Sequence, residues 1–158
     1  KIRDKVDVLI VSMHWGEEYN NTPNKNEEEI ANYLSSLGVD IIIGHHPHVI
    51  QPIRYIGKTL VIYSLGNFIS GQKGSINKLI GLMVMLNINK TIDNDIKTIT
   101  INNINTELSY TYHQNNIFKV IPFSNLDDSI LPDYQQYYST YSSIIKKYDN
   151  TIKVNGIN

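Results

Sequence analysis

The chain has 158 residues and a formal net charge of −1, with 14 Lys and Arg against 15 Asp and Glu. Its 41% hydrophobic content is enough for a folded core and argues against wholesale disorder. The charge balance argues against a dedicated nucleic-acid binder. The absence of Cys excludes disulfides and thiolate zinc sites. No apolar run approaches the roughly 20 residues of a membrane helix.

A strand–helix–strand unit is predicted at the start of the chain. Val6–Val11 is a short run of apolar and β-branched residues, typical of a buried strand. A helix follows from about Glu27 to Leu37, with Asn26 as its N-cap and Glu29 at the capping-box position. Val39–Ile43 is a second apolar strand, so we expect a βαβ unit with parallel strands.

The middle of the chain changes from parallel to antiparallel patterns. Strands are predicted at Val49–Tyr55 and Thr59–Tyr63, and the loop Ser64–Phe68 follows. Longer strands with turn residues between them then indicate an antiparallel meander. These strands are Leu79–Asn89 and Ile96–Leu108 around an Asp93–Asp95 turn, then Tyr110–His113 and Phe118–Ile121 around Asn115–Asn116.

A C-terminal helix is predicted after the linker Leu126–Pro132, capped by Asp133 and running to about Tyr148. Its tyrosines and isoleucines recur at helical spacing on one stripe. Two interpretations stand: a helix that docks on the domain through its aromatic face, or a stacking surface for a polymer or partner. We therefore divide the chain into residues 1–125, the main domain, and 126–158, linker and amphipathic helix.

Four histidines follow the two strands of the βαβ unit. His14 comes after the first strand, and His45, His46 and His48 come after the second. The carboxyl ends of parallel strands share one edge of a sheet, about 5 Å apart for neighbours and about 10 Å apart with one strand between. Neutral imidazole is a good ligand for zinc, iron and manganese, so this edge is a candidate metal site.

Each candidate site residue also has a purely structural interpretation. A single histidine such as His14 is more often packed or solvated than metal-bound. Glu18, close after His14, either orients imidazole N–H groups or lies on a solvated loop. Asn67 either hydrogen-bonds a substrate or simply forms a turn after Gly66. His113 has no partner signal and is interpreted as structural.

Three motifs give the chain a family resemblance. They are His14-Trp15-Gly16-Glu17-Glu18-Tyr19, Gly44-His45-His46-Pro47-His48-Val49-Ile50-Gln51-Pro52 and Tyr63-Ser64-Leu65-Gly66-Asn67-Phe68. In this order they resemble the bacterial capsule-synthesis family typified by the poly-γ-glutamate biosynthesis protein CapA, a branch of the calcineurin-like metallophosphoesterases. The resemblance covers about residues 5–125. It implies an α/β fold: the C-terminal half of a two-sheet metallophosphoesterase-like sandwich, with a βαβ unit, antiparallel strands and a terminal helix.

The resemblance also implies a dinuclear site for Mn, Fe or Zn at the strand ends. His14, His45 and His48 match the family's histidine ligands. His46 and Glu18 are then the candidate catalytic groups, with His46 as proton donor to a leaving group. Trp15 and Asn67 are the candidate substrate contacts.

The carboxylate motifs of the superfamily, Asp-x-His, Gly-Asp-x-x-Asp and Asn-His-Asp/Glu, are absent from these 158 residues. We expect a fragment of a longer protein that alone binds metal weakly, is inactive, and exposes part of a sheet or self-associates. For the full-length protein the resemblance implies hydrolase-like capsule biosynthesis at the outer face of the cytoplasmic membrane, anchored by an upstream helix, with this fragment itself soluble. Its partners would be an anionic polymer or phosphoester substrate and other capsule proteins, without nucleic acid. The alternatives are a non-enzymatic export or assembly scaffold and a generic metal-dependent phosphoesterase.

Overall fold

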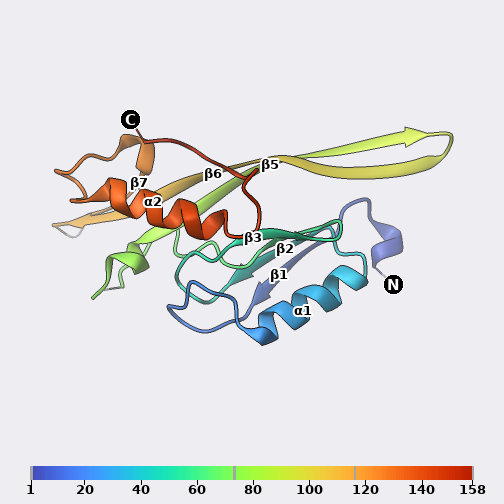
Figure 1. Cartoon of the computed structure of the whole chain (residues 1–158), viewed down its shortest axis with the longest axis horizontal. Helices are drawn as coiled ribbons and strands as arrows, with labels where there is room; N and C mark the ends of the chain where they lie inside the picture. Colours follow the sequence, from blue (N-terminus) through green and yellow to red (C-terminus); the bar gives the residue numbers. More distant parts are fainter. Residues whose placement is uncertain (1, 73, 116, 158) are drawn as a thin grey trace.

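The computed structural model describes residues 2–72, 74–115 and 117–157 and shows two sheets packed face to face, with one helix beside each (Figure 1). The first sheet has the strand order β1-β2-β4-β3, and the second has β5-β6-β7 with β8 paired to β6. The predicted two-sheet α/β fold is confirmed. No helix in these three ranges is long and apolar enough to cross a membrane.

The first sheet contains the predicted βαβ unit. Strands β1 (Ile10–His14), β2 (Ile41–His45) and β4 (Thr59–Ile62) are parallel, and β3 (Ile53–Ile56) runs antiparallel to β4. Strands β1 and β2 are direct neighbours, with His14 in register with His45. Of the two spacings considered for these strand ends, the structure has the shorter one.

Helix α1 (Lys25–Ser36) covers one face of this sheet, where Ala31, Ile42, Val61 and Tyr63 form a small buried cluster with Trp15. The prediction of its start was wrong by two residues. Asn24, not Asn26, is the N-cap, and Glu27, not Glu29, completes the capping box. The sequence contains two overlapping Asn-x-x-Glu patterns, and only the first leaves Glu27 directed into the interior.

The first strand also begins later than predicted, at Ile10 instead of Val6. Residues before it are held by side chains: the Arg3 guanidinium donates to the carbonyls of Val6 and Asp7 and pairs with Asp40. Asp40 in turn accepts a hydrogen bond from the Leu9 N–H at 2.7 Å. Ladder pairing therefore starts only where the partner strand β2 begins, at Ile41.

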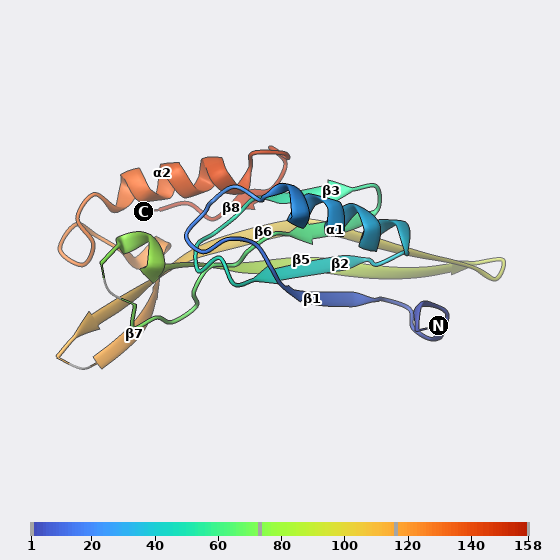
Figure 2. The same cartoon turned by 90° about the horizontal axis from the view of Figure 1, so that it is seen from below.

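The second sheet is an antiparallel meander of β5 (Ile80–Asp93), β6 (Ile96–Gln114) and β7 (Ile117–Pro122). Two predicted strands, Ile96–Leu108 and Tyr110–His113, are one continuous strand. The β6–β7 hairpin is present as expected, although Asn116 of its predicted turn lies outside the described residues. The far end of the β5–β6 hairpin extends beyond the first sheet, at the same end of the molecule as the N-terminus (Figures 1 and 2).

The core lies between the two sheets and under helix α2 (Tyr134–Ile145). Tyr134, Tyr141 and Ile145 are buried there, so the docking interpretation of the aromatic stripe is the one that the structure supports. Burial raises the pKa of the Tyr141 hydroxyl far above its usual range. Asp133 precedes the helix as predicted, but its side chain makes no capping bond. The chain ends in the short strand β8 (Lys153–Val154).

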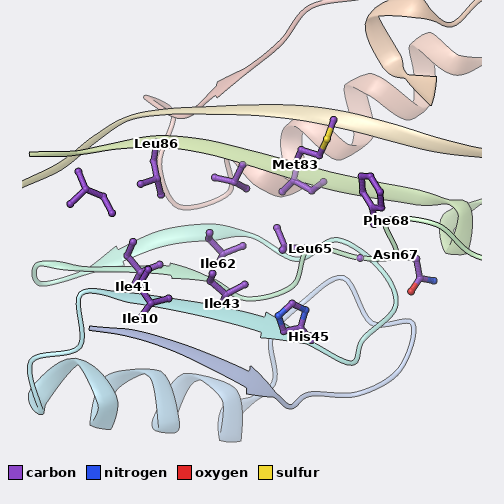
Figure 3. A pocket seen from close by; sticks show the side chains of 14 residues that line it. Ile10, Ile41, Ile43, His45, Ile62, Leu65, Asn67, Phe68, Met83 and Leu86 are labelled. Atoms are coloured by element: carbon purple, nitrogen blue, oxygen red, sulfur yellow. The ribbon is translucent and has the colours of Figure 1, made fainter. Parts of the chain in front are cut away.

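Along the β1 edge the two sheets separate and leave an apolar cleft of about 640 Å³ (Figure 3). Its walls are aliphatic side chains from both sheets, such as Ile43, Ile62 and Leu86, and Ile10 on the edge strand is 50% exposed. The first sheet is therefore partly exposed at β1. Self-association through this edge remains a prediction.

Candidate metal centre

The site lies at the carboxyl ends of β1 and β2, in the loops that follow each strand. The indole of Trp15 joins these loops to the loop after β4. The indole Nε1 donates to the Tyr63 carbonyl at 2.9 Å, and the backbone N–H of Trp15 donates to the His45 carbonyl at 3.1 Å. All three sequence motifs thus meet at Trp15.

Trp15 has a packing role in this structure. Its side chain is 5% exposed and packs under α1 with Tyr63, while its substrate contact stays a prediction. Gly44 makes this packing possible: a Cβ there would lie 1.8 Å from the Tyr63 carbonyl oxygen and 2.3 Å from the indole nitrogen. Position 44, the penultimate residue of β2, therefore requires glycine.

The loop after β2 directs two histidines to one place. His46 and His48 both have left-handed backbone conformations, with φ values of 100° and 59°, and Pro47 between them is buried. Strained conformations of this kind persist only where surrounding contacts hold them. Here the Pro47 carbonyl accepts from the Tyr19 N–H at 2.7 Å, which joins this loop to the one after β1. The predicted strand Val49–Tyr55 begins only at Ile53, because the preceding residues form this loop.

Glu18, His46 and His48 form the one group of three metal-capable side chains that the described ranges bring together, with ligand atoms within 4.8 Å of one another. The Nε2 of His48 lies 4.0 Å from a Glu18 carboxylate oxygen. The rings of His14 and His46 are 4.6 Å apart between centroids, so His14 borders the group. The set offers two imidazole nitrogens and a carboxylate oxygen, a combination that suits zinc, manganese or iron.

Asn67 fixes the tautomer and orientation of His48. Its amide nitrogen donates to the Lys78 carbonyl at 3.0 Å, so its oxygen is the atom that faces His48 Nδ1 at 2.9 Å. Since an amide oxygen only accepts, Nδ1 carries a proton, and in the neutral ring Nε2 is then the nitrogen with the lone pair. Histidine ligands of metals are typically held in this way. Asn67 thus contacts the histidine; a substrate contact for it remains a prediction.

His45, one of the three predicted ligands, has a different environment. It follows Ile43 on the same face of β2, and its ring points into the space between the sheets, at the end of the apolar cleft (Figure 3). The structure therefore divides the predicted trio: His48 lies in the cluster with Glu18, His14 borders it through His46, and His45 lines the cleft. The fifth histidine, His113, stacks on Phe118 in the β6–β7 hairpin, with ring centroids 4.1 Å apart.

Glu27 is a buried carboxylate behind the site, and from the sequence it is identified only as the start of the predicted helix. One of its oxygens accepts from the Asn24 N–H at 2.8 Å, while the other, like the Gln51 amide oxygen, is buried with no hydrogen-bond partner in the part of the chain that the structure describes. Burial raises the pKa of Glu27, outweighing the hydrogen bonds and the nearby His46, which lower it. Gly16 leaves room for this carboxylate, since a Cβ there would lie 2.7 Å from it.

The geometry defines a class of protein: an α/β sandwich with a histidine cluster at the carboxyl ends of parallel strands. Residues 1–72 match the family described as "Bacterial capsule synthesis protein PGA_cap". Over that region the chain is similar to this capsule synthesis family, and all three motifs lie within it. The resemblance stated from the sequence is confirmed over residues 1–72 and stays a prediction for residues 73–125.

Individual relatives give the same result over the same region. The chain is 48% identical over 66 residues to "PGA biosynthesis protein CapA" of Bacillus subtilis (strain 168), covering 42% of this chain and 17% of the relative. It is 43% identical over 70 residues to "Capsule biosynthesis protein CapA" of Bacillus anthracis, covering 44% and 17%. A "Probable polyglutamine synthesis accessory protein" of Mycobacterium tuberculosis is 33% identical over 69 residues, covering 43% and 18%. The matched segment thus spans less than a fifth of each relative.

Proposed function

We propose that this chain supplies the histidine-rich part of a divalent-metal site in a protein of poly-γ-glutamate capsule synthesis. The observation that carries the proposal is the convergence of Glu18, His46 and His48, with ligand atoms within 4.8 Å and His48 oriented by Asn67. The relatives, named for capsule, PGA or polyglutamine synthesis, support the biological setting. From the same names we infer that the chain acts together with the capsule synthesis machinery.

The donor set fits a metal ion by its chemistry. Glu18 contributes negative charge, His48 presents a free Nε2, and His46 completes a set that leaves further coordination positions open. When bound, a divalent metal would act as a Lewis acid and lower the pKa of a water molecule. The convergence favours ligand roles for His46 and Glu18 over the acid–base roles predicted for them.

A second ion belongs to the proposal for the longer protein. His14 and His45 stay proposed ligands there, and carboxylates from outside these 158 residues would have to bridge the two ions. For the longer protein we also propose hydrolase-like chemistry on an anionic polymer or a phosphoester. We further propose that it is anchored at the outer face of the cytoplasmic membrane. The main rival is a scaffold that uses this fold without metal chemistry.

Calorimetric titration of the chain with Mn²⁺ and Zn²⁺ tests the proposal. We expect one ion to bind, more weakly than micromolar, and His48→Ala to abolish binding. His113→Ala is the matched control because His113 lies in the other sheet, stacked on Phe118. Equal binding by both variants, or no binding by the wild type, would favour the scaffold. Sub-micromolar binding of two ions would contradict the expectation that upstream carboxylates are needed.

A further inference from the structure

Lys78 places an ammonium group beside the histidine cluster, with no carboxylate partner among the described residues. Its Nζ lies 3.8 Å from the ring centroid of Tyr19, and that ring stacks on His48 with 6.0 Å between centroids. Lys78 is half-buried, and it takes part in none of the ion pairs found among residues 2–72, 74–115 and 117–157. A partly desolvated cation of this kind is available to an external anion.

The position of Lys78 is fixed by the same contacts that orient His48. Lys78 lies in a short 3₁₀ helix, Ile76–Leu79, and its carbonyl accepts the hydrogen bond from Asn67. Tyr19 is held by its backbone bond to Pro47. Lys78 is therefore connected to His48 in two ways. Its carbonyl bonds Asn67, which bonds the His48 ring, and its ammonium contacts the Tyr19 ring, which stacks on His48. A group built into the site in this way differs from a surface lysine that moves freely.

The charges at this edge favour a negative ligand once a metal is bound. Glu18 is the one acidic member of the cluster, and Glu17 beside it is exposed and accepts from Asn20. A divalent ion together with the Lys78 ammonium carries more positive charge than Glu18 cancels. Sites with a net positive field raise the local concentration of anionic ligands. Lysine contacts phosphate and carboxylate oxygens as a compact point charge.

We propose that Lys78 is a substrate-recognition residue that binds an oxyanion, carboxylate or phosphate, at the rim of the histidine cluster. The inference rests on the proposed function for the identity of the substrate, a γ-linked glutamate polymer or a phosphoester. Lys78 lies outside the 72 residues that match the capsule synthesis family, so the segment between the two sheets contributes recognition to a site built by the first sheet.

Anion binding by the full chain tests this role. NMR signals of the Tyr19 ring and the Asn67 amide are followed while inorganic phosphate or tri-γ-glutamate is added, with and without Mg²⁺ as a diamagnetic divalent ion. Lys78→Gln removes the charge, Lys78→Arg retains it, and Lys58→Gln is the control with the same change in net charge. Lys58 is exposed in the turn before β4, at the opposite end of the sheet.

We expect saturable shifts for the wild type, a loss of affinity of about tenfold or more in Lys78→Gln, and near wild-type binding by Lys78→Arg and Lys58→Gln. Tighter binding of tri-γ-glutamate than of phosphate identifies the carboxylate polymer as the substrate class, and the reverse order identifies a phosphoester. Unchanged affinity in Lys78→Gln, or no anion binding by the wild type, overturns the proposal. Lysine-dependent anion binding by a chain that binds no metal would leave this role standing and refute the metal site.

Discussion

The hydrogen bond between Asn67 and His48 makes a quantitative prediction for metal affinity. Asn67→Ala removes the acceptor 2.9 Å from Nδ1 of His48, and with it the preference for the tautomer whose Nε2 is free. It also removes the donor to the Lys78 carbonyl. Groups that orient histidine ligands typically contribute 10–100-fold to metal affinity, or about 1.4–2.7 kcal/mol. We expect a loss in that range.

Asn67→Asp separates orientation from simple packing. The carboxylate still accepts from His48 Nδ1, so metal affinity should stay within about threefold of the wild type, as expected for a carboxylate behind a histidine ligand. Both affinities are measured by calorimetric titration with Zn²⁺, with Asn102→Ala as control because that asparagine lies on the exposed β5–β6 hairpin. Wild-type affinity in Asn67→Ala, or equal losses in the Ala and Asp variants, would refute the role assigned to Asn67.

Three further predictions concern the scaffold around the site. Gly44→Ala forces a methyl group against the Tyr63 carbonyl, and we expect a loss of about 3 kcal/mol or more in urea unfolding. Glu27→Gln supplies an amide N–H that can donate to the unpaired Gln51 oxygen. Because burial raises the pKa of Glu27, the stability of the wild type should fall as pH rises through that pKa, whereas the stability of the variant should not. Asp7→Asn removes two ion pairs to the β5–β6 hairpin, so amide hydrogen exchange in the hairpin should accelerate. The wild type should show the same acceleration below about pH 2, where Asp7 is protonated, or in 1 M salt, which screens the pairs.

Each of these has an outcome that contradicts it. A Gly44→Ala chain with wild-type stability would show that the loop after β2 shifts without cost. A pH–stability curve for Glu27→Gln that parallels the wild type from pH 4 to 9 would mean that this carboxyl does not titrate with folding. For Asp7, the hydrogen bonds from Lys90 and Lys97 hold its pKa at about 2, below the ordinary value of 3.8, so the stabilisation is present above pH 3.8 and is lost toward pH 2. Salt-insensitive exchange in the hairpin would contradict this assignment.

The topology was predictable because periodicity and chain order decide it. Two apolar β-branched runs separated by an amphipathic helix leave few arrangements besides a parallel βαβ unit. The boundaries were not predictable, because they depend on contacts distant in sequence. The start of β1 is set by the salt bridge between Arg3 and Asp40, and the start of α1 by the space that Gly16 leaves for Glu27.

The site was predictable at the level of the sheet edge, but not of individual side chains. Alternation along β2 places His45 on the cleft face, whereas the left-handed conformations of His46 and His48 arise in the loop and leave no local signal. No local sequence signal indicates that the Trp15 indole N–H bonds the Tyr63 carbonyl in the interior. Lys78 reaches the site from the 3₁₀ helix Ile76–Leu79, which lies outside the three motifs.

The most direct test of the account is the state of each histidine ring when Zn²⁺ is added. Long-range ¹H–¹⁵N NMR spectra distinguish Nδ1 from Nε2 in every imidazole of the 158-residue chain. The account predicts that Nε2 of His48 becomes the metal-bound nitrogen while Nδ1 keeps its proton to Asn67, that His46 also binds, and that His113 does not change. Metal-induced shifts confined to His14 and His45, or no zinc-dependent change at His46 and His48, would contradict the central claim that Glu18, His46 and His48 form the metal site.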